Sequence, residues 1–379
     1  MNMEALLEFI RSRYPGQEAI ALHEPRFRGN EKRYVDDAIA STFVSSVGEY
    51  VTRFEAGLRE ITGAGHAVAT VNGTAALHLA LLLAGAGPGD LVLTQAFSFV
   101  ATANAIAHTG AEPVFLDIEK STLGLDPGGL REFLAARAEK RGQGCFDRDT
   151  GRRYAACVPM HTFGHPCRLE EILDICGEYG LPVVEDAAEA LGSLWRGKHC
   201  GTFGLMGILS FNGNKIVTAG GGGAILTGDG QLAARAKHLT TTAKKPHPWL
   251  FEHDETAYNY RLPNLNAALG YAQLEQLDCF ITDKRRLAEE YAAFCAAHNI
   301  GFMEEPPGAR SNYWLNAVFT AGREERDIFL ARSNGRGLQT RPAWGLLPAQ
   351  PMYRQCRCAD IRVSAEIAEI LVNIPSSVR

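Results

Sequence analysis

A single lysine followed closely by four consecutive glycines is the first feature of the sequence that could perform chemistry. Lys215 ends the tetrapeptide Asn-Gly-Asn-Lys, and the glycine run covers residues 220–223. Apolar, strand-like runs flank this loop at residues 206–210 and 223–227. Desolvation of a lysine in such a turn favours the neutral amine, which can attack a carbonyl carbon and form a Schiff base. The alternative is an ordinary surface loop with a solvated lysine. The other motifs of the sequence are needed to choose between these two interpretations.

An acidic pair at the end of a predicted strand is the second feature. The apolar run at residues 182–184 is followed by Glu185 and Asp186, and the second acid is expected at the carboxyl tip of the strand. An aspartate there can pair with a pyridine nitrogen and keep it protonated, which makes the ring a better electron sink. Alanines follow Asp186, so a helix N-cap is the alternative role for this residue.

Two turns between a predicted strand and a predicted helix could bind an anion and a flat ring. Residues 67–71 form a strand-like run, and Gly73, Thr74 and a helix rich in alanine and leucine follow it. The free N–H groups and the dipole of such a helix end favour an anion, although a tight turn without a ligand has the same sequence. After the next strand, Phe97 or Phe99 could lie against a planar ring or belong to the core.

Strand-like and helical segments alternate along the first part of the chain. This pattern predicts an α/β fold with a mostly parallel sheet, helices on both faces, and ligands at the carboxyl ends of the strands. The last two strands are too close in sequence for a crossover helix, so one strand is expected to be antiparallel. Residues 137–153 are charged and are expected to form an exposed excursion. The seven strand candidates cover residues 67–71, 91–94, 113–116, 155–160, 182–185, 206–210 and 223–227.

The alternation of strand-like and helical segments ends near residue 262. A long helical pattern continues to residue 297, and short strand-like pieces such as residues 314–319 follow it. We therefore expect a large domain at residues 1–261, which includes an amino-terminal helical segment, and a smaller carboxyl-terminal α+β domain at residues 262–379.

Composition and charge argue against several classes of protein. The 379 residues are 46% hydrophobic and 21% charged, as in a globular protein, and a net charge of -5 without a basic, aromatic cluster argues against a nucleic-acid partner. No apolar stretch is long enough to cross a bilayer, and residues 1–17 do not resemble a signal peptide, so we expect a cytoplasmic protein without membrane contact. The cysteines include no C-x-x-C pair, and a turn-like Phe-Gly centre separates His161 from His165, so we expect no metal site.

Together these motifs resemble the sugar-nucleotide aminotransferases of the DegT/DnrJ/StrS family. The resemblance covers almost the whole chain and implies a pyridoxal 5'-phosphate (PLP) enzyme of the aspartate aminotransferase fold, PLP fold type I. The motifs that carry it are, in chain order, Gly29-Asn30-Glu31, Ser46-Val47-Gly48, Phe54-Glu55, Asn72-Gly73-Thr74-Ala75-Ala76-Leu77, Phe99-Val100-Ala101-Thr102, Glu185-Asp186-Ala187-Ala188, Ser210-Phe211-Asn212-Gly213-Asn214-Lys215, Tyr258-Asn259-Tyr260-Arg261 and Gln350-Pro351-Met352-Tyr353.

The resemblance implies a role for each residue that matches a family motif. Lys215 matches the Schiff-base lysine, and Asp186 matches the partner of the pyridine nitrogen. Phe99 resembles the residue that stacks on the cofactor ring. Glu189 stands where many members carry Gln or His near the ring hydroxyl, and other members carry Glu.

The phosphate of the cofactor has its own set of matches. The backbone of Gly73 and Thr74 and the hydroxyl of Ser210 resemble the phosphate cup of the family, although Asn72 replaces a frequent serine. Asn259 resembles the asparagine that reaches the phosphate of the neighbouring subunit. The resemblance therefore implies a homodimer with shared active sites.

The resemblance also implies the substrates. Glutamate is expected as the amino donor and a nucleotide-linked 4-keto-6-deoxy sugar as the acceptor, in the biosynthesis of bacterial surface glycans. The loop around Lys215 looks most like that of members that make 4-amino sugars from UDP-2-acetamido-2,6-dideoxy-4-ketohexoses. His161, Arg341 and Trp344 are candidate substrate contacts, because residues 340–344 resemble a substrate-side segment, and surface packing is the alternative.

Three other functions are compatible with parts of the sequence. A PLP-dependent sugar dehydratase of the same family would have lost the lysine, usually to histidine, so Lys215 argues against it. A non-catalytic regulator would not need Lys215, Asp186 and Ser210 together. A dinucleotide-binding oxidoreductase would share the β/α pattern, but no G-x-G-x-x-G motif follows the first strand.

Overall fold

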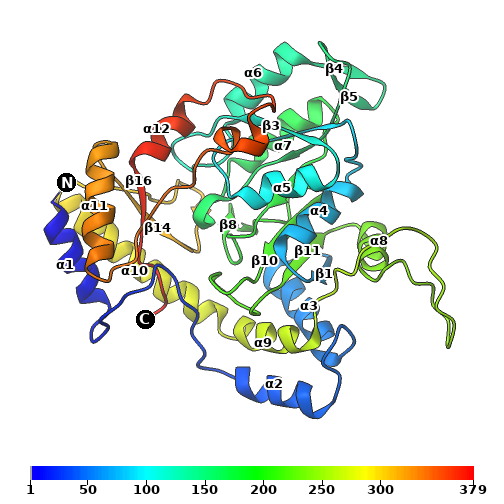
Figure 1. Cartoon of the computed structure of the whole chain (residues 1–379), viewed down its shortest axis with the longest axis horizontal. Coiled ribbons are helices and arrows are strands. Elements are labelled where there is room, and N and C mark those ends of the chain that lie inside the picture. Colours follow the sequence, from blue (N-terminus) through cyan, green and yellow to red (C-terminus); the bar gives the residue numbers. More distant parts are fainter. Residues whose placement is uncertain (1) are drawn as a thin grey trace.

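Seven strands form the core of the central sheet, and their spatial order differs from their order in the chain. In Figure 1 helices surround the strands of this sheet. The computed structural model describes residues 2–379. Parallel bridges between residues 157 and 183 and between residues 160 and 186 join two hydrogen-bonded ladders into this sheet. Among these seven strands, β11 (Gly223–Thr227) is antiparallel to both of its neighbours and the other pairs are parallel, which confirms the predicted sheet with one antiparallel strand. In spatial order the strands are β1 (His66–Thr70), β11 (Gly223–Thr227), β10 (Met206–Ser210), β7 (Val184–Asp186), β6 (Arg153–Val158), β2 (Leu91–Gln95) and β3 (Glu112–Leu116).

Helices cover both faces of the sheet because successive side chains of a strand point to opposite faces. On β10, for example, Ile208 packs against one layer of helices and Leu209 against the other. The first face is covered by α4 (Gly73–Leu83), α5 (Val100–His108) and α8 (Gly230–Thr240). The second face is covered by α3 (Glu49–Thr62), α6 (Pro127–Arg137), α7 (Leu169–Glu178) and α9 (Asn264–Leu274), and α2 (Glu31–Ala40) packs on α9. The predicted layers are therefore confirmed.

A smaller antiparallel sheet lies in the carboxyl-terminal part of the chain. The amino-terminal helix packs with it, because Leu6 and Ile10 share a buried cluster with Tyr291, Val318 and Phe329. The division of the chain between residues 261 and 262 stays a prediction. No helix within residues 2–379 combines the length and apolar composition needed to cross a membrane. The elements are β12 (Gly301–Phe302), β14 (Asn316–Phe319), β16 (Leu371–Ile374), β15 (Arg341–Pro342), α1 (Met3–Arg13), α10 (Leu277–Ala297), α11 (Arg323–Gly335) and α12 (Arg362–Ile370).

The charged segment at residues 137–153 forms a β-hairpin and is not simply an exposed excursion. Asp147 at its end is fully buried, and it accepts hydrogen bonds from the Tyr154 hydroxyl (2.7 Å) and from the Arg357 guanidinium. The distant arginine gives this buried carboxylate an ionic partner. The remaining short elements are β4 (Ala138–Arg141), β5 (Gly144–Asp147), β8 (Leu194–Trp195), β9 (Lys198–His199), β13 (Ala309–Arg310), η1 (Thr162–Gly164), η2 (Leu347–Ala349) and η3 (Pro351–Tyr353).

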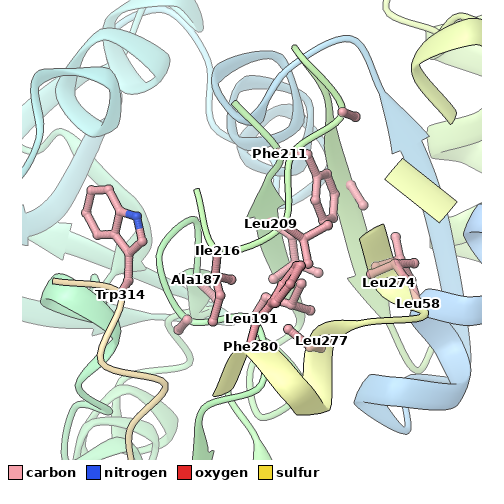
Figure 2. Close-up of a cluster of buried hydrophobic side chains, with 14 of the residues drawn as sticks. Leu58, Ala187, Leu191, Leu209, Phe211, Ile216, Leu274, Leu277, Phe280 and Trp314 are labelled. Carbon is pink, nitrogen blue, oxygen red and sulfur yellow. The ribbon is translucent and has the colours of Figure 1, made fainter. Parts of the chain in front are cut away.

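A buried apolar cluster ties the sheet to the loop that carries Lys215 (Figure 2). Leu209 and Phe211 lie at the end of β10, Ile216 directly follows the lysine, and Phe280 reaches the cluster from α10. Burial of one such side chain stabilises the fold by about 1.5–3 kcal/mol. The residues on both sides of Lys215 are thus held by the core, and the lysine is fixed between them.

Candidate active site

A cavity of about 720 Å³ opens where β1, β2, β7 and β10 end. This is the edge of the sheet at which a parallel arrangement is expected to bind ligands. Residues of β15 and β16 and the loops beside them form the opposite wall. Lys215 and Asp186 both line this one cavity, so the two groups on which the predicted chemistry depends face a common space. The predicted site residues that line it are Gly73, Thr74, Phe99, Asp186, Glu189, Ser210, Lys215, Arg341 and Trp344.

Asp186 lies at the tip of β7, beside Ile208 of β10 in the parallel register. The residue is only 4% exposed, and its Oδ2 accepts a hydrogen bond from the Thr102 hydroxyl at 2.8 Å. Its Oδ1 accepts a hydrogen bond from the N–H of Ala188 at 3.2 Å. Burial raises the pKa of Asp186, and these hydrogen bonds oppose the effect. A buried carboxylate is stabilised by an N–H donor or a cation beside it. A protonated pyridine nitrogen would be both.

The loop that carries Lys215 is closed by backbone hydrogen bonds. The N–H of Phe211 donates to the Gly222 carbonyl at 2.8 Å, and the N–H of Lys215 donates to the Asn212 carbonyl at 3.0 Å. Part of the glycine run is explained by close packing, because a Cβ on Gly223 would overlap the carbonyl oxygen of Asn72. The loop therefore fits tightly against the first turn of α4.

Glu189 and Trp314 contact the amine of Lys215. The amine nitrogen lies 3.1 Å from Glu189 Oε1 and 3.9 Å from the centroid of the Trp314 ring system. The other oxygen of Glu189 accepts a hydrogen bond from the N–H of Phe163 at 2.9 Å. Burial raises the pKa of Glu189, and the charge of Lys215 opposes this effect. The lysine thus has a fixed, charge-assisted partner inside the cavity.

The amino-terminal end of α4 forms the anion-binding part of the cavity. Asn72 caps this helix, since its Oδ1 accepts a hydrogen bond from the N–H of Ala75 at 2.8 Å. Gly73 and Thr74 come before that residue, and their N–H groups have no carbonyl partner within the helix. A Cβ on Gly73 would lie 2.9 Å from Cβ of Ser210, so only glycine leaves this turn open beside the serine hydroxyl. These groups form a cradle suited to a phosphate.

Two aromatic residues and an arginine complete the walls. Phe99, the N-cap residue of α5, is 48% exposed, so its ring is free to contact a ligand. The Trp344 ring lies 6.2 Å from that of Phe99, at an interplanar angle of 56°. Arg341 is exposed, and its guanidinium donates hydrogen bonds to Asn334 Oδ1 (2.9 Å) and to the Thr340 carbonyl (2.9 Å). The arginine is thus held at the rim by its own strand and by α11.

Sequence comparison identifies the family. A profile of the DegT/DnrJ/EryC1/StrS aminotransferase family matches residues 25–379. The chain belongs to this family. It is similar to a Bacillus subtilis (strain 168) protein named putative pyridoxal phosphate-dependent aminotransferase EpsN, with 37% identity over 336 residues, which are 88% of this chain and 84% of the relative.

Two further proteins are similar to this chain over nearly the full length. GDP-perosamine synthase of Escherichia coli O157:H7 is 34% identical over 361 residues, which cover 94% of this chain and 93% of the relative. The crystal structure of the aminotransferase TlmJ from Streptoalloteichus hindustanus superposes with a TM-score of 0.85 at 30% identity, over 94% of this chain and 93% of that one. These matches confirm the predicted fold and the predicted family.

As a member of this family, the chain is a PLP-dependent aminotransferase. The residues of the cavity fit the cofactor, because the buried Asp186 carboxylate suits a pyridine nitrogen and the Gly73 turn leaves a cradle for a phosphate. Phe99 offers an exposed ring on the wall of the same cavity. When bound, PLP supplies an aldehyde for Schiff-base chemistry and a ring that withdraws electrons. The roles of individual residues in holding PLP stay predictions.

His161 does not line the cavity, and its predicted contact with substrate is corrected here. The side chain is fully buried, with Nε2 3.1 Å from Glu185 Oε2 and with Nδ1 accepting a hydrogen bond from the N–H of Cys167 at 3.1 Å. Glu185 precedes Asp186 on β7, so its side chain points to the opposite face of the sheet. His161 is a hydrogen-bond partner of that buried carboxylate, on the face of the strand that points away from the cavity.

Asn259 also lies outside the cavity of its own chain. The residue is exposed, and its backbone forms an antiparallel bridge with Thr241 in the segment after α8. A location away from the cavity is what a contact with the phosphate of a neighbouring subunit would require. That contact stays a prediction.

Several residues of the site were missed by the sequence. Thr102 lies in the motif that begins at Phe99, but only the fold turns its hydroxyl toward Asp186. Trp314 was recognised as part of a strand-like piece and not as a neighbour of Lys215. His23 and Asn373 also line the cavity from the two ends of the chain. A lone polar or aromatic residue of this kind carries no local signal that separates it from core packing.

Proposed function

We propose that this enzyme transfers the amino group of glutamate to a nucleotide-linked 4-keto-6-deoxy sugar. The observation that carries the proposal is that Lys215 and Asp186 line one cavity, together with the anion cradle at Gly73. The sugar class is supported by the names of relatives, one of which is GDP-perosamine synthase. Surface-glycan biosynthesis in the cytoplasm is the proposed setting.

The residues of the chain have distinct roles in this proposal. The amine of Lys215, once free, would take a proton from the α-carbon of the donor and would return it to the carbonyl-derived carbon of the cofactor, acting as general base and then as general acid. Glu189, 3.1 Å away, keeps this amine in place. Asp186 holds the ring nitrogen in its protonated form, and the hydroxyl of Thr102 keeps the carboxylate oriented.

The specificity of the enzyme is proposed to lie on the opposite wall. Arg341 offers an exposed guanidinium, which suits the diphosphate of a nucleotide sugar, and Trp344 offers an apolar face for the base or the sugar. Asn259 of a second subunit is proposed to complete the phosphate site in a homodimer. The acceptor is proposed to be UDP-2-acetamido-2,6-dideoxy-4-ketohexose, on the resemblance of the loop around Lys215; GDP-linked keto sugars are the competing class.

The test uses the purified protein loaded with PLP. Borohydride is expected to bleach its visible imine band and to leave the reduced cofactor covalently attached to Lys215. With ¹⁵N-glutamate and a panel of UDP-, GDP- and dTDP-linked 4-keto sugars, mass spectrometry is expected to find ¹⁵N in the amino sugar product. The UDP-linked acetamido sugar is expected to have a kcat/KM at least about tenfold higher than the others, since a contact worth 1.4 kcal/mol changes the rate tenfold.

The same experiment separates the alternatives. A dehydratase would release a product lighter by one water, without ¹⁵N. A regulator would show no turnover with any keto sugar. If borohydride attaches the cofactor to Lys215 but the enzyme aminates none of the sugars, the proposed acceptor class is contradicted.

A further inference from the structure

The ring face of Trp314 lies against the amine of Lys215, 3.9 Å from the nitrogen to the ring centroid. Its ring belongs to the buried apolar cluster, and Figure 2 shows it on the side of Ile216 that faces away from Leu209 and Phe211. The indole N–H donates a hydrogen bond to the carbonyl of Asn214 at 2.7 Å. A single side chain thus contacts both the reactive amine and the backbone of the residue before it.

Trp314 itself is held by several hydrogen bonds. Its backbone N–H donates to Asn312 Oδ1 at 2.8 Å, and its carbonyl accepts a hydrogen bond from the buried amine of Lys284 at 3.0 Å. The amide of Asn312 also donates to the carbonyl of Glu189 at 2.9 Å. The ring is therefore fixed relative to two elements at once, the lysine loop and the segment that carries Glu189.

The amine of Lys215 consequently has two fixed neighbours of the same electrostatic preference. Glu189 Oε1 lies 3.1 Å from the nitrogen, and the face of the indole lies on it at 3.9 Å to the ring centroid. A carboxylate and the face of an indole both favour a cation over a neutral amine. With the ring only 5% exposed, water does not weaken the contact as it would on the surface.

We propose that Trp314 is a positioning residue, whose ring face holds the free, protonated amine of Lys215 beside Glu189. In a transamination the lysine has to leave the cofactor carbonyl, carry a proton and return. A defined resting place keeps the amine within reach of the reacting carbon during that interval and prevents its escape toward solvent. The inference rests on the proposed role of Lys215 as proton carrier, and it does not depend on which sugar is the acceptor.

The first test measures the amine directly, in protein freed of PLP. The rate at which an amine-reactive reagent modifies Lys215, followed by peptide mass spectrometry across pH, gives a midpoint for its titration. In Trp314→Leu this midpoint is expected to fall by about half a unit to one unit, because a desolvated cation–π contact is lost. Trp314→Phe keeps a ring face and is expected to stay closer to the parent protein. The other titratable groups near this amine are Glu189, Asp186 and His23, and they are unchanged in both variants.

A second measurement avoids any change of shape. Growth on fluorinated tryptophan weakens the negative face of the indole while its size is almost kept, so the midpoint is expected to fall with increasing fluorination. This remains informative even if Trp314→Leu does not fold. Midpoints that are the same in the fluorinated protein and in the parent protein would overturn the proposal.

The PLP-loaded enzyme provides the third readout. Trp314→Leu is expected to lower kcat about tenfold and to leave the KM of both substrates within about twofold, because the lost contact is with the lysine and not with substrate. Trp344→Leu is the matched control, an aromatic residue of the same cavity with a proposed substrate contact. It is expected to raise KM without moving the midpoint of Lys215.

The two proposals can fail separately. If the midpoint moves as expected but no keto sugar is aminated, the positioning role stands and the proposed acceptor is wrong. If sugars are aminated but the Trp314 variants titrate like the parent protein, the enzyme function stands and the positioning role is wrong.

Discussion

The sheet side and the carboxyl-terminal side of the cavity are built differently. On the sheet side, Asp186 and Ser210 are the last residues of β7 and β10, and hydrogen bonds between the two strands fix how far apart they lie. On the other side, Arg341 and Trp344 come from a two-residue strand and the loop after it. Asp186 is buried, whereas Arg341 is exposed.

This difference separates two tasks. Groups that must meet reacting atoms need positions fixed within a fraction of an ångström, and adjacent strand ends in a packed sheet provide them. Groups that recognise the rest of a substrate can lie on loops, where a change of residue disturbs little else. We therefore expect variants on the sheet side to lower kcat and variants on the opposite side to raise KM.

Lys215→Ala gives the largest expected effect. Amine transfer is expected to fall by at least about 10³-fold, because the variant loses its nucleophile and its general acid and base together. Single-turnover formation of the amino sugar, followed by mass spectrometry, measures it. Lys198→Ala is the control, since Lys198 is exposed and lines no part of the cavity. A rate within tenfold of the parent enzyme would remove Lys215 from the centre of the chemistry.

Asp186→Asn comes next. We expect kcat to fall by about 10²–10³-fold, since the buried carboxylate that we propose as the partner of the cofactor ring nitrogen is replaced by a neutral group of the same shape. Thr102→Val, which removes only the hydrogen bond to Asp186, is expected to cost about tenfold. Steady-state kinetics with saturating substrates measure both. Equal effects in the two variants would show that the hydrogen bond, and not the charge, is what matters.

Lys284 gives a test of stability on the carboxyl-terminal side. Burial lowers the pKa of the Lys284 amine from 10.5 to about 7. Between pH 7 and pH 10.5 this amine is therefore protonated in the unfolded chain and mostly neutral in the folded protein. Stability is therefore expected to rise with pH in this window, by about 2 kcal/mol between pH 7 and pH 9. Urea unfolding of the parent protein and of Lys284→Met at several pH values measures the difference. Parallel curves would contradict the prediction.

Arg341→Ala is expected to have the smallest effect. The KM for the nucleotide sugar is expected to rise about tenfold with kcat kept within about threefold, because an exposed charge contributes to binding and not to the chemical step. Arg362→Ala is the control, because the Arg362 side chain is 88% exposed and does not line the cavity. A drop in kcat alone would break the proposed division between the two walls.

Much of the fold could be predicted from local pattern. All seven strands of the central sheet were found because each is a short apolar run followed by a turn or a helix. The antiparallel orientation of β11 was predicted because too few residues separate positions 210 and 223 in the sequence for a crossover helix. Lys215 and Asp186 were found because a strand tip is recognisable in sequence and their residue types suit the chemistry.

Contacts between distant segments could not be predicted in this way. The hairpin within the exposed segment and the burial of Asp147 were not predicted, because the partner of Asp147 is an arginine 210 positions later. His161 was mistaken for a substrate contact because only the packed structure turns it toward Glu185. The indole of Trp314 binds a carbonyl 100 positions before it.

The sequence by itself determined which segments are strands, where they end, and which strand tips carry an amine and a carboxylate. Alternation and turn chemistry act over a few residues, so they can be read from neighbours in the chain. Only the tertiary structure decided that Trp314 covers the amine of Lys215 and that Glu185 keeps His161 away from the cavity. Those choices depend on which surfaces pack together after the strands have formed, and packing joins residues that no local pattern relates.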